Sequence, residues 1–215
     1  MAQWLLHSVA ARIFPGSNPG LRFQKIKKVY MIHGWTGNPK EGWFPQIKKN
    51  LEEKGFNVAA FEMPETDTPS IEGWVGFLEE NIPSEEIDEE TYFIGHSIGC
   101  QTIMRFLEKL HKHKKVKGCV FVAGWFTLTK EAYEDEEDKK LMHPWTTKEL
   151  DFSRVLDHCD NFLAIFSKDD PFVKLSDSEI FKEKLGAKIA ITDGRGHFVA
   201  KEEPFVLKEI LDFVK

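Results

Sequence analysis

The chain reads Thr91-Tyr92-Phe93-Ile94-Gly95-His96-Ser97-Ile98-Gly99-Cys100 near its middle, an apolar run followed by a serine between two glycines. The run before Gly95 is aromatic and β-branched, which predicts a strand. After Ser97 one helix face is predicted by the spacing of Ile103, Phe106, Leu107 and Leu110. Strand, G-x-S-x-G and helix form the pattern of a nucleophile elbow. The three fixed positions alone recur by chance in roughly one such chain in fourteen, so the elbow needs partners elsewhere in the sequence.

The composition is that of a globular domain. The chain has 215 residues, 41% of them hydrophobic and 30% charged, which suits a single domain with a full core. A net charge of −6 argues against nucleic-acid binding, and no run approaches the ~20 apolar residues of a membrane span. Three cysteines without a C-x-x-C motif indicate reduced thiols. We therefore expect a cytoplasmic protein without nucleic-acid or membrane partners, and the oligomeric state stays open.

The sequence divides into an extension, a domain and an insertion. Residues 1–24 contain no acidic residue and include the turn-forming run 15–20, so we interpret them as an N-terminal extension or artefact rather than a targeting segment. The domain is predicted to span residues 25–215. Between about 124 and 152 the chain carries two tryptophans and an acidic run, and this part is predicted to be a small lid-like insertion.

The domain alternates apolar strands with amphipathic helices. Strands are predicted at 29–32, 57–63, 91–94, 116–123, 161–167 and 187–192, and helices at 41–54, from 70 onward, 100–110, 176–185 and 202–214. Strands that are apolar on both faces indicate a parallel sheet covered by helices on both sides. We therefore predict an α/β fold with a mostly parallel sheet of about six strands. In such folds, ligands bind beyond the carboxyl ends of the strands.

A serine nucleophile needs a histidine base and a carboxylate that orients the histidine. In the hydrolase chain order both partners follow the serine. His197 is the only histidine that follows the last predicted strand, and it lies on a Gly-flanked loop. Asp169 and Asp170 both follow the preceding strand. We favour Asp170, because Pro171 favours an extended residue before it, and Asp169 is the alternative that caps the turn or bonds nearby backbone.

An oxyanion hole requires two backbone N–H groups. One is predicted at Ile98, directly after the nucleophile, and the other at Trp35, in the loop after the first strand. The candidate pocket residues are His33, Trp125, Trp145 and Phe198. Trp125 and Trp145 either wall an apolar pocket or pin the insertion down. No metal-binding motif, P-loop or dinucleotide motif is present, so no metal and no cofactor are expected.

The sequence resembles the α/β-hydrolase superfamily and, within it, the small serine hydrolases related to retinoblastoma-binding protein nine. The resemblance rests on the stretches 29–35, 43–45, 57–64, 94–99, 104–106, 144–145, 167–173 and 196–198, so it spans most of the chain from Lys27 onward. It implies a triad of Ser97, Asp170 and His197 on a compact sheet with a small or absent lid. Residues 1–24 and the acidic stretch 134–138 depart from the family pattern.

The expected activity is hydrolysis of a small ester by a carboxylesterase-like serine hydrolase through an acyl-enzyme. An amide or a thioester is the alternative substrate. Two other possibilities remain open. One is a non-catalytic binding or regulatory module on a hydrolase scaffold, and the other is a cofactor-free lyase that keeps the elbow.

Overall fold

One parallel sheet forms the centre of the molecule. The structure is a computed structural model that describes residues 26–215, so the predicted extension 1–24 lies outside the described residues. The sheet has the order β2-β1-β3-β4-β5-β6, and its strands are β1 (Lys28–Ile32), β2 (Asn57–Phe61), β3 (Thr91–His96), β4 (Gly118–Val122), β5 (Phe162–Ser167) and β6 (Lys188–Thr192). All neighbouring pairs are parallel. The predicted fold class is confirmed.

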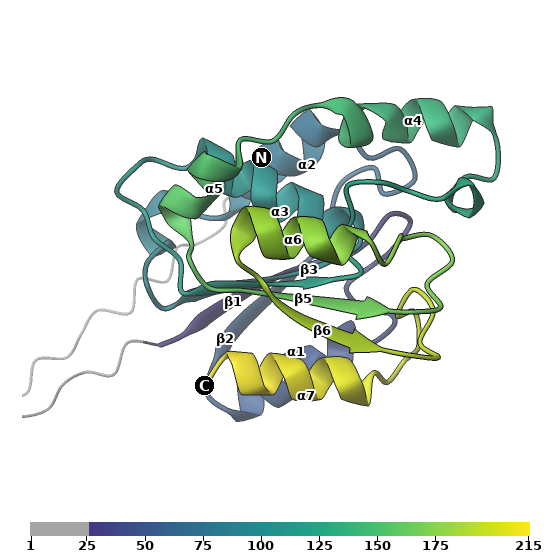
Figure 1. Cartoon of the computed structure of the whole chain (residues 1–215). Helices are drawn as coiled ribbons and strands as arrows, with labels where there is room; N and C mark the ends of the chain where they lie inside the picture. The colour runs from purple at the N-terminus through teal and green to yellow at the C-terminus, as the bar shows by residue number, and fades with distance from the viewer. Residues whose placement is uncertain (1–25) are drawn as a thin grey trace, which may run out of the picture.

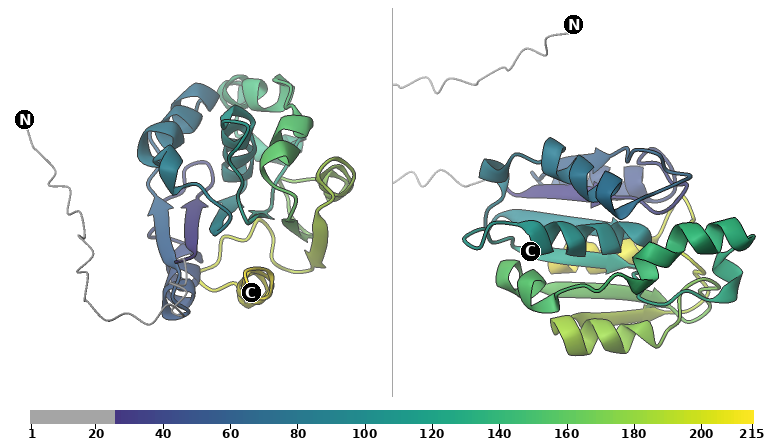
Figure 2. Two further views of the ribbon diagram at one scale, coloured as in Figure 1. Left: turned by 90° about the vertical axis from the view of Figure 1, so that its left-hand side faces the viewer. Right: turned by 90° about the horizontal axis from the view of Figure 1, so that it is seen from above.

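Helices cover both faces of this sheet (Figures 1 and 2). They are α1 (Phe44–Glu53), α2 (Ile71–Asn81), α3 (Ile98–Lys109), α4 (Glu136–Thr147), α5 (Phe152–His158), α6 (Asp177–Leu185) and α7 (Pro204–Phe213), with short 3₁₀ turns η1 (Ser84–Glu86) and η2 (Lys130–Ala132). One core cluster joins the sheet to α1 and α7, and the other joins it to α2, α3, α5 and α6. Within residues 26–215 no helix combines the length and the apolar character needed to cross a bilayer.

The central strands are buried on both faces, as the sequence predicts. In β4, Cys119 and Phe121 lie in the core on the α3 side, while Val120 and Val122 lie in the core on the α1 and α7 side. All five residues of β4 are buried. Such a strand has no solvent-facing side, which explains why its sequence is continuously apolar rather than alternating.

Residues 124–152 contain helix α4, which the sequence analysis did not predict. The carboxylate of Asp135 accepts hydrogen bonds from the N–H groups of Glu137 and Asp138 and so caps the start of α4. The indole N–H of Trp145 donates to the carbonyl of Pro69 at 3.0 Å. The Arg105 guanidinium on α3 donates to a carbonyl just after α4 at 2.7 Å. These bonds hold α4 at the end of the sheet to which the strands point (Figure 1).

Candidate active site

Ser97 lies at a sharp turn between β3 and α3. Its backbone has a φ of 52° and a ψ of −121°, a conformation that an L-residue adopts only at a cost of about 1–3 kcal/mol. The N–H group of Ser97 donates to the carbonyl of Val122 on the neighbouring strand at 2.9 Å. This hydrogen bond to the sheet stabilises the strained turn. The turn places Ser97 just beyond the carboxyl end of β3.

The two glycines of the motif allow this turn to pack closely. A Cβ atom at position 99 would lie 2.4 Å from the carbonyl oxygen of Ile32, and one at position 95 would lie 2.8 Å from the N atom of Cys100. Both contacts are with backbone, which cannot move aside cheaply. Glycine is therefore required by the close approach of α3 to β1 and β3.

Asp170 and His197 form a hydrogen-bonded pair beside this turn. The Nδ1 atom of His197 lies 2.8 Å from Oδ2 of Asp170, and only 3% of the Asp170 side chain is exposed. The other carboxylate oxygen, Oδ1, accepts from the N–H groups of Phe172 at 2.9 Å and Val173 at 3.1 Å. Both oxygens are thus occupied, which fixes the carboxylate and places the Nδ1 proton of His197 on the Asp170 side.

Asp169 has a different position from its neighbour. Its carboxylate accepts from the Ser167 hydroxyl and from the N–H groups of Arg195 and Gly196, the latter two at 3.1 and 3.2 Å. The hydrogen bond from Ser167 is the main reason that the pKa of Asp169 is lowered. Asp169 therefore holds the loop that carries His197, rather than the imidazole ring itself.

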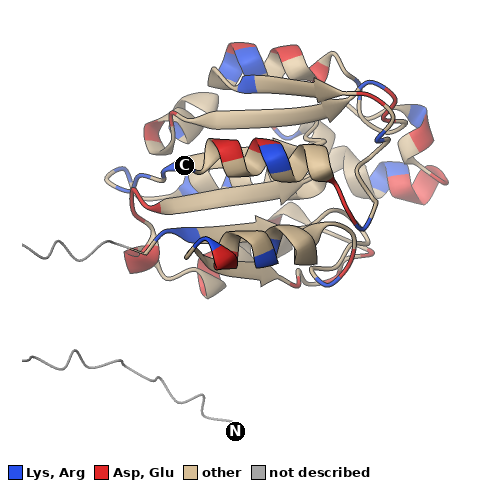
Figure 3. Ribbon diagram, turned by 90° about the horizontal axis from the view of Figure 1, so that it is seen from below, with Lys and Arg blue, Asp and Glu red and all other residues tan. Residues whose placement is uncertain are grey.

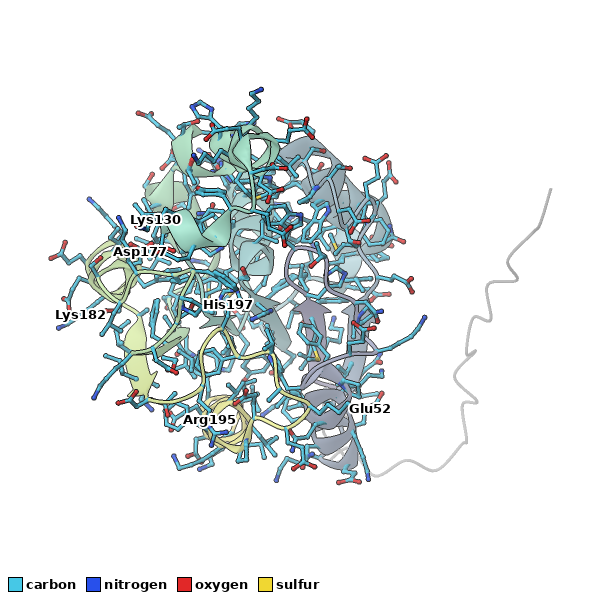
Figure 4. The ribbon with its side chains drawn as sticks, turned by 90° about the vertical axis from the view of Figure 1, so that its right-hand side faces the viewer. Glu52, Lys130, Asp177, Lys182, Arg195 and His197 are labelled. Carbon is cyan, nitrogen blue, oxygen red and sulfur yellow. The ribbon has the colours of Figure 1, made fainter. Side chains whose placement is uncertain are left out.

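The Ser97 hydroxyl faces a cavity of about 570 Å³ that His197 and Trp125 also line. Ser97 is 8% exposed, and its Oγ accepts a hydrogen bond from the indole N–H of Trp125 at 3.3 Å. Within residues 26–215 no hydrogen bond joins Ser97 Oγ to the His197 ring. Hydrogen bonds between catalytic groups are often long before a substrate is bound. The two side chains are therefore connected here by lining the same cavity and not by a hydrogen bond. Figure 4, viewed toward the end of the sheet to which the strands point, shows His197 near the centre of this side.

The two predicted oxyanion donors lie at the same cavity. Ile98 and Trp35 both line it, and Ile98 is the first residue of α3, where backbone N–H groups lack partners within the helix. Among the described residues neither N–H group is hydrogen-bonded within the chain. The Trp35 indole donates to the carbonyl of Asp67 at 3.0 Å, which ties the loop after β1 to the loop after β2.

Comparison with known proteins identifies the family. A family model described as serine hydrolase matches residues 29–211. The chain belongs to the serine hydrolase family. Its sequence is 29% identical to the YdeN protein of Bacillus subtilis over 176 residues, covering 82% of this chain and 88% of YdeN. It is 28% identical over 160 residues to the serine hydrolase RBBP9 of Rattus norvegicus, covering 73% of this chain and 78% of RBBP9.

Solved structures agree with the fold of this serine hydrolase. The crystal structure of YdeN matches with a TM-score of 0.75 and 28% identity, over 87% of this chain and 98% of YdeN. The esterase RhEst1 from Rhodococcus sp. ECU1013 matches with a TM-score of 0.63 and 16% identity, over 88% of this chain and 90% of RhEst1. The second likeness concerns the fold alone.

The predicted pocket residues have different positions in this serine hydrolase. Trp125 lines the cavity, whereas Trp145 does not. The Trp145 ring is buried against Trp74, with ring centroids 6.3 Å apart, and so pins α4 to α2. Phe198 lines the cavity and packs into the core beside Trp43, whose indole donates to the Phe198 carbonyl at 2.9 Å.

His33 also lines the cavity, but its ring is committed to the backbone. The N–H group of Met63 donates to Nε2 of His33 at 3.0 Å, so Nδ1 carries the proton and donates to the Gly34 carbonyl at 2.7 Å. Burial lowers the pKa of His33. His33 therefore braces the loop after β1. Within residues 26–215 no three His, Cys, Asp or Glu side chains come together as a metal site.

His96, which the sequence analysis did not select as a site residue, contacts the loop of His197. Its Nε2–H donates to the main-chain carbonyl of His197 at 2.8 Å, and the two rings lie 4.9 Å apart. Burial, and secondarily the His197 ring, lowers the pKa of His96 to about 3. A neutral His96 thus positions His197. No local pattern reveals this contact, because the acceptor is a backbone atom 101 residues away.

We expect His96→Gln to flatten the acid side of the stability profile. Because the folded-state pKa lies below the usual ~6.5, the unfolded state binds more protons between about pH 6.5 and 3, and acid destabilises the native protein. Between pH 7 and 5 the full linkage is about 2 kcal/mol. Since the ring borders the open cavity, we expect His96→Gln to reduce the drop in unfolding free energy by about 1 kcal/mol.

Urea denaturation of both proteins at the two pH values measures this difference. The control is His113→Gln, which changes an exposed histidine and should leave the drop unchanged. An identical drop in wild type and His96→Gln would contradict the assignment of a neutral, half-buried His96.

Proposed function

We propose that this serine hydrolase cleaves a small carboxylic ester through an acyl-enzyme on Ser97. In this proposal His197 takes the hydroxyl proton as Ser97 attacks the carbonyl, and Asp170 orients His197 and stabilises its cation. The observation that carries the proposal is the hydrogen bond of 2.8 Å between Asp170 and His197, since His197 lines the cavity onto which Ser97 opens. The proton on Nδ1 leaves Nε2 free to act as the base.

The developing oxyanion would be held by the N–H groups of Ile98 and Trp35. Ile98 adds the partial positive charge of the first turn of α3. His197 would then return its proton to the leaving alcohol, and water would release the acyl group by the same steps in reverse order. Removing one such donor generally costs about 2.7–4 kcal/mol of transition-state stabilisation.

An ester is preferred over an amide as the proposed substrate because an alcohol is a better leaving group than an amine. It is preferred over a thioester because the fold neighbours include proteins named as esterases. The non-catalytic alternative would suit a cavity closed to ligands, whereas this cavity holds about 570 Å³. We place the activity in the cytoplasm, supported by three free, buried cysteines.

A fluorophosphonate probe tests the proposed nucleophile directly. We expect the native protein to form one covalent adduct, which peptide mass spectrometry assigns to Ser97, because only an activated serine reacts at a useful rate. Heat-denatured protein serves as the control and should remain unlabelled. An unlabelled native protein, or an adduct on another serine, would count against Ser97 as the nucleophile.

A further inference from the structure

The cavity above Ser97 is bordered by charges of one sign. Its acidic rim consists of the carboxylates of Glu41, Asp67, Glu131, Glu134 and Asp138. The chain carries 29 Lys and Arg against 35 Asp and Glu, and Figure 3 shows both signs scattered over the helices. Among the described residues that line the cavity there is nevertheless no Lys or Arg. The cavity is therefore selectively acidic in a surface that is elsewhere mixed.

Nearby lysines leave most of this rim unpaired. The Lys130 ammonium lies 3.8 Å from a carboxylate oxygen of Glu131, and both side chains are largely exposed. Such an exposed ion pair is weak, so Lys130 screens the charge of Glu131 only slightly. Lys40 pairs with Glu62 outside the cavity at 3.1 Å. Among residues 26–215, Glu41, Asp67, Glu134 and Asp138 form no ion pair. The rim therefore presents at least four carboxylates to whatever enters the cavity.

Two hydrogen bonds also hold parts of the rim in place. The Asp138 carboxylate accepts from the Glu134 N–H at 2.8 Å, which fixes the turn at the start of α4. In the loop after β2, the backbone carbonyl of Asp67 accepts a hydrogen bond from the Trp35 indole at 3.0 Å. Fixed charges of one sign around a low-dielectric cleft focus the field and attract ligands of the opposite sign.

The interior between rim and nucleophile suits an organic cation. The aromatic residues Trp35, Trp125 and Phe172 line the cavity together with Met142. Aromatic faces attract ammonium groups, and this attraction grows when the cation is desolvated. Carboxylates and aromatic rings around one cavity are the two features that recognise an alkylammonium group.

We propose that this cavity selects esters that carry a positively charged ammonium group and rejects anionic ones. The inference rests on the proposed function, because it concerns the substrate class of the same site. The ammonium group lies toward the acidic rim while the ester carbonyl reaches Ser97. No additional chemical step is required, since the charge acts on binding and orientation.

Matched ester pairs test the inference. One pair is acetylcholine and its neutral isostere 3,3-dimethylbutyl acetate, with the cation on the alcohol. The other is p-nitrophenyl 4-(trimethylammonio)butanoate and p-nitrophenyl 5,5-dimethylhexanoate, with the cation on the acyl group. We expect kcat/KM, measured by titration of released acid, to favour the cationic member of at least one pair by about tenfold at about 0.02 M salt. The preference should shrink at about 0.5 M salt.

Carboxamide variants assign the preference to the rim. We expect the double variant Glu134→Gln/Asp138→Asn, and separately Asp67→Asn, to lower the cationic-to-neutral ratio of kcat/KM several-fold. Asn keeps an oxygen that accepts the Glu134 N–H, and Asp67 contributes its backbone to the Trp35 contact, so both variants preserve the local bonds. The control is Glu137→Gln, which lies in the same helix but does not line the cavity and should leave the ratio unchanged.

The outcomes separate this inference from the proposed function. Equal or neutral-favouring rates in both pairs, with measurable turnover, would overturn the cation preference and leave the esterase proposal intact. A preference that survives both carboxamide variants and high salt would overturn the role of the rim. Absence of turnover for all four esters would overturn the proposed function and this inference together.

Discussion

Replacing Ser97 by alanine is expected to lower kcat for ester hydrolysis by about 10⁴- to 10⁶-fold, to the level left by binding and the oxyanion donors alone. The change removes the Oγ that the elbow presents to the cavity and creates little new space, since alanine keeps the Cβ. The hydrogen bond from Trp125 is also lost, which leaves the indole N–H facing the open cavity. Initial rates of p-nitrophenyl acetate hydrolysis at saturating substrate measure the effect.

Ser176→Ala is the matched control for this prediction. Ser176 is exposed, and its side chain makes no capping bond at the start of α6, so its loss should leave kcat unchanged. Thermal unfolding monitors the fold of both variants. A correctly folded Ser97→Ala protein with the wild-type rate would show that another group, or a contaminating enzyme, performs the reaction.

The sheet and the elbow could be predicted from the sequence because their signals are local. A strand such as β4, with all five residues buried, has to be continuously apolar, and Gly95 and Gly99 mark a turn where backbone passes too close for a Cβ. That Ser97, Asp170 and His197 lie at the same edge of the molecule also follows from a parallel sheet, because each lies after the carboxyl end of a strand.

Helix α4 was missed because its apolar pattern is short and interrupted. Within the helix only Met142 and Trp145 are buried, and Pro144 lies between them, so too few apolar positions establish a helical periodicity. Its acidic first turn favours a helix start, but it was interpreted as a solvated surface. Its position depends on tertiary contacts of Trp145 and Arg105 with distant carbonyls. Of the two alternatives for Trp145, the structure favours the one in which it pins the insertion down, since its ring packs against Trp74 and is not among the residues that line the cavity.

The electrostatic character of the cavity could not be predicted from the sequence either. The acidic run after Glu131 is ordinary as a solvated surface, and Glu41 and Asp67 lie far from it along the chain. Only the fold brings these carboxylates around one entrance. The same holds for His96 and His197, which are joined through a main-chain carbonyl. Side chains whose partners are backbone atoms far away along the chain leave no pattern that a single sequence can reveal.

Replacing Asp170 by asparagine is expected to lower kcat by about 10⁴-fold while leaving the fold intact. The reason lies in the two backbone bonds at Oδ1. The N–H groups of Phe172 and Val173 require an acceptor, so the amide oxygen of the asparagine takes that position and its NH₂ group faces His197. The Nδ1 atom of His197 must then accept, which moves the ring proton to Nε2, and the base that should deprotonate Ser97 is lost.

Asp169→Asn provides the discriminating control. Its amide oxygen can still accept from the N–H groups of Arg195 and Gly196. The substitution removes no contact with the His197 imidazole, because Asp169 bonds the loop and not the ring. We expect its kcat to fall by about tenfold or less, the equivalent of one weakened hydrogen bond. The reverse order, with Asp169→Asn the more damaged enzyme, would transfer the orienting role to Asp169. Because the two aspartates are adjacent in sequence and differ only in which partner each oxygen meets, this pair of variants tests the geometry of the site rather than the mere presence of a carboxylate.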